Sequence, residues 1–235
     1  MKELDKSLQG IVLDIDGTIV SLSKGVGEIY CELLGERGIV TDPTRLQEIV
    51  RRVWNAFQPE YLNTKEYNRT THERERETWL SFVREVLSQA ELPCAHDTQF
   101  VEWIYDTFST NRFRRLEPGI ESFLRASQRM GFRVYAATNN DVRSKAVLEA
   151  VGVKDLLSGI FVAGDVGWKK PSRNYYHILR EQIDAPADAL LHIGNDENLD
   201  VRVPLECGWR AALYDPKNKG AEPRFSRFDE LYRGS

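Results

Sequence analysis

Short runs of β-branched and other apolar residues recur along this chain, with helical patterns between them. The runs lie at residues 10–14, 132–137, 159–163, 189–193 and 210–214. Continuous apolar runs of this length are typical of strands that are buried on both faces of a parallel sheet. From the second run onward, the intervening helical segments have the usual length of a crossover connection. We therefore predict an α/β protein with a doubly wound parallel sheet.

The interval between the first two runs is different. It holds more than a hundred residues, whereas a strand–helix–strand unit needs about 30. Apolar residues recur at helical spacing within it, for example over 46–57 and 79–87. We predict an all-helical domain at 22–112, inserted into an α/β core domain that is formed by 1–21 and 113–235.

Composition and charge exclude several classes of function. The chain of 235 residues has 32 Lys and Arg against 36 Asp and Glu, so its net charge is −4 and it has no basic field to bind nucleic acid or an anionic membrane. No apolar run approaches the roughly 20 residues of a membrane span, and Met1–Asp5 has no signal-peptide core, so we expect a cytoplasmic protein. The three cysteines have no CxxC spacing, which argues against a disulfide framework or a cysteine zinc site. Nothing in the sequence sets an oligomeric state.

The first strand closes in two carboxylates and a glycine, Asp14-Ile15-Asp16-Gly17-Thr18. Ligands of open α/β sheets bind at the carboxyl ends of strands, and alternation along the chain sends Asp14 and Asp16 to the same side. Two neighbouring carboxylates repel, so one of them holds a proton or a cation lies between them. One could then attack an electrophile while the other transfers a proton. Gly17 permits a sharp turn, and Thr18 offers a hydroxyl and an amide; an acidic turn that caps the next segment is the alternative interpretation.

Polar residues also follow the second and third strands of the predicted core. Thr138 and Asn139 leave the sheet where a helix begins, which is a favourable place for an anion. Lys170 stands before a proline at the entry to the next helix, so its ammonium has a defined direction. Its neighbour Lys169 is predicted to be an ordinary surface lysine.

The fourth strand ends in an oxygen-rich segment that contains Asn195, Asp196 and Asp200. Carboxylate and amide oxygens suit a hard cation such as Mg²⁺. The sequence therefore predicts a fourth contribution to one site at the carboxyl edge of the sheet.

Several other charged or polar residues have simpler interpretations. His192 alternates within a strand and is predicted to be a core residue. The charged run 73–77 is predicted to be a solvated helix face. Arg112, Arg114 and Arg115 cluster near the end of the helical insert, where they could attract an anionic substrate, but we favour a solvated hinge.

The four strand ends, taken in order, resemble the haloacid dehalogenase-like (HAD) hydrolase superfamily, in the branch with a helical cap inserted after the first motif. The resemblance implies a Rossmann-like core and makes Asp14 the nucleophile that forms an aspartyl-phosphate, with Asp16 as the general acid and base. It further implies that Thr138, the amide of Asn139 and Lys170 bind the phosphoryl group, Lys170 also neutralising charge beside the nucleophile.

The resemblance also implies bound Mg²⁺, with Asp14, the backbone carbonyl of Asp16 and Asn195 as its ligands. Here the chain departs from the family pattern, because Asn195 stands where an acidic ligand is usual, while Asp200 matches the later acid. An amide oxygen can still coordinate Mg²⁺, but a negative charge is lost, so we expect weaker metal binding. Asp196 could substitute only by a local shift of the chain.

The function that follows is a Mg²⁺-dependent phosphomonoester hydrolase that acts on a small phosphorylated metabolite. One alternative is a binding protein of this fold that Asn195 has made catalytically weak or inactive. A second is a 2-haloacid dehalogenase, in which the same aspartate displaces halide from carbon. Asp16 argues against this alternative, since a halide leaving group needs no proton and the dehalogenases of the family lack an acid at this position.

Overall fold

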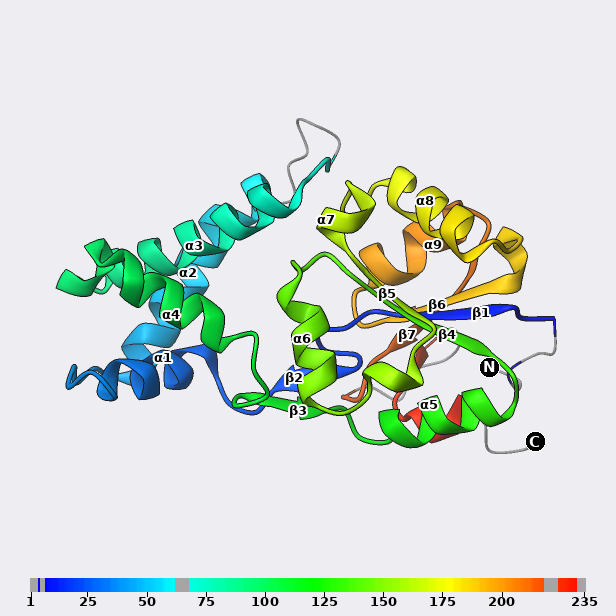
Figure 1. Cartoon of the computed structure of the whole chain (residues 1–235), viewed down its shortest axis with the longest axis horizontal. Helices are drawn as coiled ribbons and strands as arrows, with labels where there is room; N and C mark the ends of the chain where they lie inside the picture. Colours follow the sequence, from blue (N-terminus) through cyan, green and yellow to red (C-terminus); the bar gives the residue numbers. More distant parts are fainter. Residues whose placement is uncertain (1–3, 5–6, 62–67, 218–223, 232–235) are drawn as a thin grey trace.

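The computed structural model describes residues 4, 7–61, 68–217 and 224–231, so the expectation for Met1–Asp5 falls mostly outside the described residues. Its centre is a parallel sheet with the strand order β5-β4-β1-β6-β7-β8 (Figure 1). The strands are β1 (Gly10–Leu13), β4 (Arg133–Thr138), β5 (Gly159–Val162), β6 (Leu190–Gly194), β7 (Arg210–Tyr214) and β8 (Arg224–Phe225). The predicted α/β sheet is thus confirmed, and β8 is an addition that the sequence pattern did not indicate.

Helices cover both faces of this sheet, because successive strand residues point to opposite sides. In β1, Ile11 and Leu13 enter one hydrophobic cluster and Val12 enters another. The first face carries α5 (Ile120–Arg129), α6 (Arg143–Ala150), η3 (Lys154–Leu156) and η6 (Phe228–Leu231). The second face carries α8 (Arg173–Ile183) and α9 (Val203–Glu206). Three short helical turns adjoin the ends of strands, namely α7 (Ala163–Val166), η4 (Ala187–Ala189) and η5 (Glu197–Arg202).

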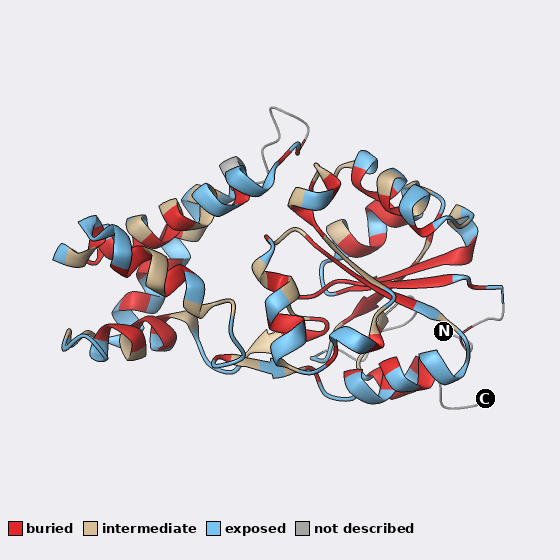
Figure 2. Cartoon of the chain, viewed as in Figure 1, coloured by how far each residue is buried: buried red, intermediate tan, exposed pale blue. Residues whose placement is uncertain are grey.

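A second group of helices lies to one side of the sheet, at the left of Figure 1. They are α1 (Val26–Gly35), α2 (Pro43–Tyr61), α3 (His72–Gln89), η2 (Pro93–His96) and α4 (Thr98–Thr107). These helices, here called the helical part, pack their apolar faces around a hydrophobic cluster of their own (Figure 2). Side chains mark where two of them begin, since Thr71 accepts a hydrogen bond from the Arg74 amide and Asp97 accepts one from the Phe100 amide. None of the described helices is long and apolar enough to cross a membrane.

The chain passes between the sheet and the helical part twice, and the two passages are hydrogen-bonded to each other. They form an antiparallel ribbon of β2 (Val20–Leu22) and β3 (Arg114–Leu116), in which Leu22 is opposite Arg114. A further backbone contact is made where the Thr70 amide donates to Gly167 at 3.0 Å. The helical part is therefore attached at the ribbon and also docked against the segment that leads to Lys170.

Two surface predictions are wrong at this docking contact. Lys169 and Glu75 are both buried, and the Lys169 ammonium lies 3.0 Å from the Glu75 carboxylate. A run of five charged residues exceeds one helical turn, so one of its members must face inward. Glu75 precedes Trp79 by four positions, which places it on the apolar face of α3.

Candidate active site

The end of β1 places Asp14 beside the buried ammonium of Lys170. The Asp14 amide donates to the carbonyl of Ile193 in β6. This hydrogen bond fixes Asp14 at the carboxyl end of β1, in the middle of the sheet. Lys170 is 1% exposed, and its Nζ lies 2.6 Å from Asp14 Oδ1 and 2.7 Å from Asp200 Oδ1. Three residues that the sequence assigned to different strand ends are thus in direct contact.

The buried trio carries one ammonium against two carboxylates, and the pKa values reflect this imbalance. Burial, with a contribution from Asp200, raises the pKa of Asp14 to about 7 despite the opposing effect of Lys170. Burial alone would lower the pKa of Lys170, but the two carboxylates outweigh it and hold that pKa well above its usual value. Burial would raise the pKa of Asp200, yet Lys170 and His192 bring it below the usual range. One negative charge, centred on Asp14, therefore lacks a compensating cation.

Asp200 is held by three donors. Besides Lys170, His192 Nε2 lies 3.0 Å from Oδ1, and the Asp196 amide donates to Oδ2 at 3.0 Å. Burial lowers the pKa of His192, so the neutral ring donates through Nε2, a tautomer assigned from its carboxylate partner. His192 is confirmed as a core residue. The Asp196 carboxylate accepts from the Asn198 and Leu199 amides, so it caps η5 instead of facing Asp14.

The side chain of Asn139 holds the backbone of Lys170 at both of its polar groups. Asn139 Oδ1 accepts from the Lys170 amide at 2.6 Å, and Asn139 Nδ2 donates to the Lys170 carbonyl at 2.8 Å. The Asn139 carbonyl in turn accepts from the hydroxyl of Tyr61, the last residue of α2, at 3.0 Å. The sequence suggested only the amide of Asn139, and this clamp was missed. Thr138 is buried beside it, with Oγ1 accepting from the Asn140 amide.

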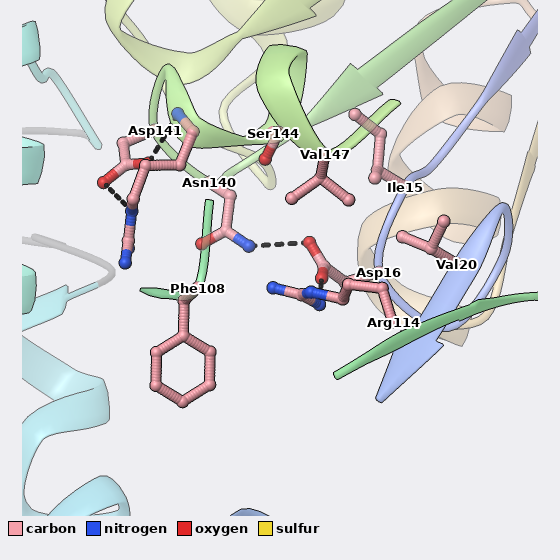
Figure 3. A pocket seen from close by; sticks show the side chains of 10 residues that line it. Ile15, Asp16, Val20, Phe108, Arg114, Asn140, Asp141, Ser144 and Val147 are labelled. Atoms are coloured by element: carbon pink, nitrogen blue, oxygen red, sulfur yellow. Dashed lines mark hydrogen bonds and ion pairs between the residues drawn. The ribbon is translucent and has the colours of Figure 1, made fainter. Parts of the chain in front are cut away.

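Asp16 accepts a hydrogen bond at each of its carboxylate oxygens (Figure 3). Arg114 donates to Oδ1 at 2.8 Å and Asn140 donates to Oδ2 at 2.6 Å. The Arg114 side chain is only 12% exposed, so the prediction of a solvated hinge is wrong for this residue, although it holds for Arg112 and Arg115, which are exposed. Arg114 and Asn140 are site residues that sequence reasoning missed. One feature of the sequence could have indicated this role for Arg114, namely its position where the chain returns from the helical insert to the sheet.

A pocket lies beside Asp16, between the sheet edge and the helical part. Phe108, Arg114, Asn140 and Ser144 are among the residues that line it, as Figure 3 shows. Arg143 also lines it, but its guanidinium is engaged by Asp141 and by the carbonyl of Tyr105 in α4. The lining of the pocket includes Asp16 but not Asp14, Lys170 or Asp200.

Gly17, in the loop after β1, lies close to Asn195, in the loop after β6. Gly17 has φ +83°, and a Cβ at this position would lie 2.3 Å from Asn195 Nδ2. The Asn195 side chain is thus packed against the first motif, and its role as a metal ligand stays a prediction. The Thr18 hydroxyl is fully buried and has no hydrogen-bond partner among the described residues.

We expect Gly17→Ala to lower the free energy of unfolding by about 2 kcal/mol or more, because a left-handed backbone costs an alanine roughly 1–2 kcal/mol and the new methyl group also displaces Asn195. Gly131→Ala is a matched control, since Gly131 has φ +84° with open space around it. Urea denaturation measures both variants. A Gly17→Ala loss no larger than that of Gly131→Ala would contradict the close packing of Asn195.

The oxygen atoms gathered here suit a hard divalent cation. The Asp14 carboxylate, the backbone carbonyl of Asp16 and the Asn195 amide could hold it, and the uncompensated charge on Asp14 favours it. Within the described ranges, no three His, Cys, Asp or Glu side chains are arranged to hold a metal. A donor set of one carboxylate, one carbonyl and one amide would bind Mg²⁺ less tightly than one with two carboxylates.

The comparisons with known proteins agree with this arrangement. A model of haloacid dehalogenase-like hydrolases matches residues 8–208, and the chain therefore belongs to this hydrolase family. One relative is the haloacid dehalogenase-like hydrolase domain-containing protein 3 of Bos taurus, 23% identical over 228 residues, which cover 92% of this chain and 88% of the relative. Another is the 5-amino-6-(5-phospho-D-ribitylamino)uracil phosphatase YigB of Escherichia coli, 30% identical over 70 residues, or 30% of this chain and 29% of the relative.

Solved structures share the fold over almost the whole chain. The putative HAD-hydrolase YfnB of Bacillus subtilis, whose crystal structure is bound to magnesium, has a TM-score of 0.68 at 20% identity and covers 96% of this chain and 97% of its own. The defluorinating L-2-haloacid dehalogenase Rha0230 has a TM-score of 0.77 at 10% identity, with 95% of each chain covered. Identities this low show the fold alone.

Proposed function

We propose that this protein is a Mg²⁺-dependent phosphomonoester hydrolase that acts on a small phosphorylated metabolite of the cytosol through an aspartyl-phosphate. The observation that carries the proposal is that the two carboxylates have different surroundings. Asp14 is buried against an ammonium, and Asp16 is held beside the pocket by two hydrogen-bond donors. Transfer from a phosphate ester needs a nucleophile and a proton donor in these places, whereas displacement of halide needs no proton donor.

In the first half of the proposed reaction, a carboxylate oxygen of Asp14 attacks phosphorus in line with the leaving oxygen. The phosphorus–oxygen ester bond breaks and Asp16 gives its proton to the leaving alkoxide, so that the alcohol departs and the aspartyl-phosphate remains. Lys170, Thr138 and the backbone amide of Asn139 offset the charge of the phosphoryl oxygens. Bound Mg²⁺ would supply further positive charge at the same place.

In the second half, water attacks the phosphorus of the aspartyl-phosphate. Asp16 takes a proton from this water, the bond from phosphorus to the Asp14 carboxylate breaks, and inorganic phosphate leaves. The helical part would act as a cap, inserted at 22–112, that excludes bulk water from the pocket and selects the substrate. The proposed partners are accordingly the small substrate alone, with neither nucleic acid nor membrane.

Phosphate release from a panel of phosphorylated sugars, nucleotides and acids, assayed with Mg²⁺ and with EDTA, tests this function. We expect Mg²⁺-dependent turnover of at least one small ester. The YigB relative, a phosphatase by name, supports the choice of reaction class.

Asn195 favours the second candidate, a binding protein of this fold with little or no turnover. If Asn195 is a metal ligand, Asn195→Asp restores a negative charge and should lower the Mg²⁺ concentration for half-maximal activity by about tenfold, or about 1.4 kcal/mol. A magnesium titration of the phosphatase assay measures this shift. Unchanged or weaker metal dependence would count against Asn195 as a ligand, and turnover gained only by the variant would favour the binding protein.

A further inference from the structure

The residue that would transfer the proton is held by the strand through which the chain returns from the helical part. Both oxygens of Asp16 are occupied, Oδ1 by Arg114 of β3 and Oδ2 by Asn140, which follows β4. We propose that Arg114 is a positioning residue for Asp16, with Asn140 as its second support. This inference rests on the proposed phosphatase function.

The Arg114 guanidinium is turned inward, against Asp16. Its Nε is buried and has no hydrogen-bond partner in the described part of the chain, where Asp16 is the carboxylate that pairs with its guanidinium. An unpaired buried N–H costs free energy, and a solvent-exposed arginine would avoid that cost. Arg112 shows the ordinary arrangement, with surface ion pairs to Glu32 and Glu36. The cost at Arg114 is consistent with a requirement to fix Asp16.

A carboxylate on a loop can rotate about its side-chain bonds, and proton transfer requires hydrogen-bonding distance to the leaving oxygen. One donor would fix a single oxygen and leave the plane of the carboxylate free to turn. Two donors from different strand ends fix both oxygens of the ionised carboxylate, which is the form that takes the proton from water. The protonated acid keeps the Arg114 bond at Oδ1 and carries its proton on Oδ2. Because Arg114 is paired opposite Leu22 in the ribbon, its own position is set by the backbone.

The test compares two aryl phosphates that differ in their need for a proton donor. Phenol has a pKa of about 10, as in tyrosine, and is a poor leaving group, whereas p-nitrophenol is far more acidic and leaves with little help. We expect Arg114→Gln to lower kcat/KM for phenyl phosphate by about 10–100-fold, a fraction of the full effect of a general acid, and kcat/KM for p-nitrophenyl phosphate by less than about threefold. Asn140→Ala should show the same selectivity with a smaller loss.

Controls separate positioning from charge and from folding. Arg112→Gln removes a nearby positive charge that does not touch Asp16, so it should leave both substrates unaffected. Arg114→Lys keeps the charge and should recover part of the phenyl phosphate activity, while circular dichroism and the thermal midpoint show whether each variant is folded.

Equal loss on both esters in folded Arg114 and Asn140 variants would overturn the positioning role. Failure of the proposed function would give a different result. In that case the Asp14→Asn variant would still hydrolyse both esters. If the parent hydrolyses neither ester nor the metabolite panel, the phosphatase function and this inference fall together.

Discussion

Replacing Asp14 with asparagine is expected to abolish turnover while the fold is retained. An amide nitrogen or oxygen cannot form the aspartyl-phosphate, so hydrolysis of p-nitrophenyl phosphate should fall to the background of a purified blank, a loss of at least about 10⁴-fold. The substitution should also stabilise the metal-free protein, because it removes the uncompensated charge from a trio in which Lys170 faces two carboxylates.

The sign of the stability effect depends on pH. Burial raises the pKa of Asp14 to about 7 in the folded protein. The contribution of protonated Asp14 to the free energy of unfolding is therefore fully present below the unfolded pKa near 4, and it is lost as the pH rises towards 7. In EDTA, the thermal midpoint of Asp14→Asn should therefore exceed that of the parent at pH 8, and the difference should shrink towards pH 4. Retained hydrolysis, or a variant less stable than the parent at pH 8, would contradict this account of the site.

The second large effect is expected at Lys170. Lys170→Met leaves Asp14 and Asp200 buried without their shared cation, and loss of one partner from a buried ion pair costs about 3–5 kcal/mol. Turnover should be lost as well, because no buried ammonium then faces the phosphoryl group. Chemical denaturation and the phosphate-release assay measure the two losses separately.

The double variant Lys170→Met/Asp200→Asn distinguishes charge from packing. It removes one of the two unpaired carboxylates, so it should regain a large part of the lost stability but none of the activity. If the double variant is as unstable as Lys170→Met, the cost arises from the shape of the lysine side chain and not from the unpaired charges.

The parallel sheet and the family could be predicted because their signals are local in the sequence. Apolar runs mark the strands, and parallel strands bring their carboxyl ends to one edge, so Asp14, Lys170 and Asp200 could be placed together without knowing the strand order. The helical segments could be recognised from the spacing of their apolar residues. Their division into a separate domain at 22–112 stays a prediction.

The missed contacts all depend on how distant segments dock. Arg114 meets Asp16 only because the two passages of the chain pair as a ribbon, and neither passage has a strand pattern long enough to detect. Lys169 and Glu75 pair with each other where α3 docks against the segment that follows α7, and in the sequence each alone has the character of a surface residue. The hydrogen bonds of Asn139 to Lys170 join two strand ends, and a cap residue gives no sign of such a partner.

The ribbon also limits how this architecture can vary in length. A shift of one residue in the pairing of β2 with β3 would turn the side chain at position 114 to the opposite face and away from Asp16. Insertions or deletions between the helices leave that alignment intact, whereas a single deletion inside the ribbon does not. A foreign bundle could therefore be transplanted onto this sheet only if the cut points lie beyond Leu22 and before Arg114.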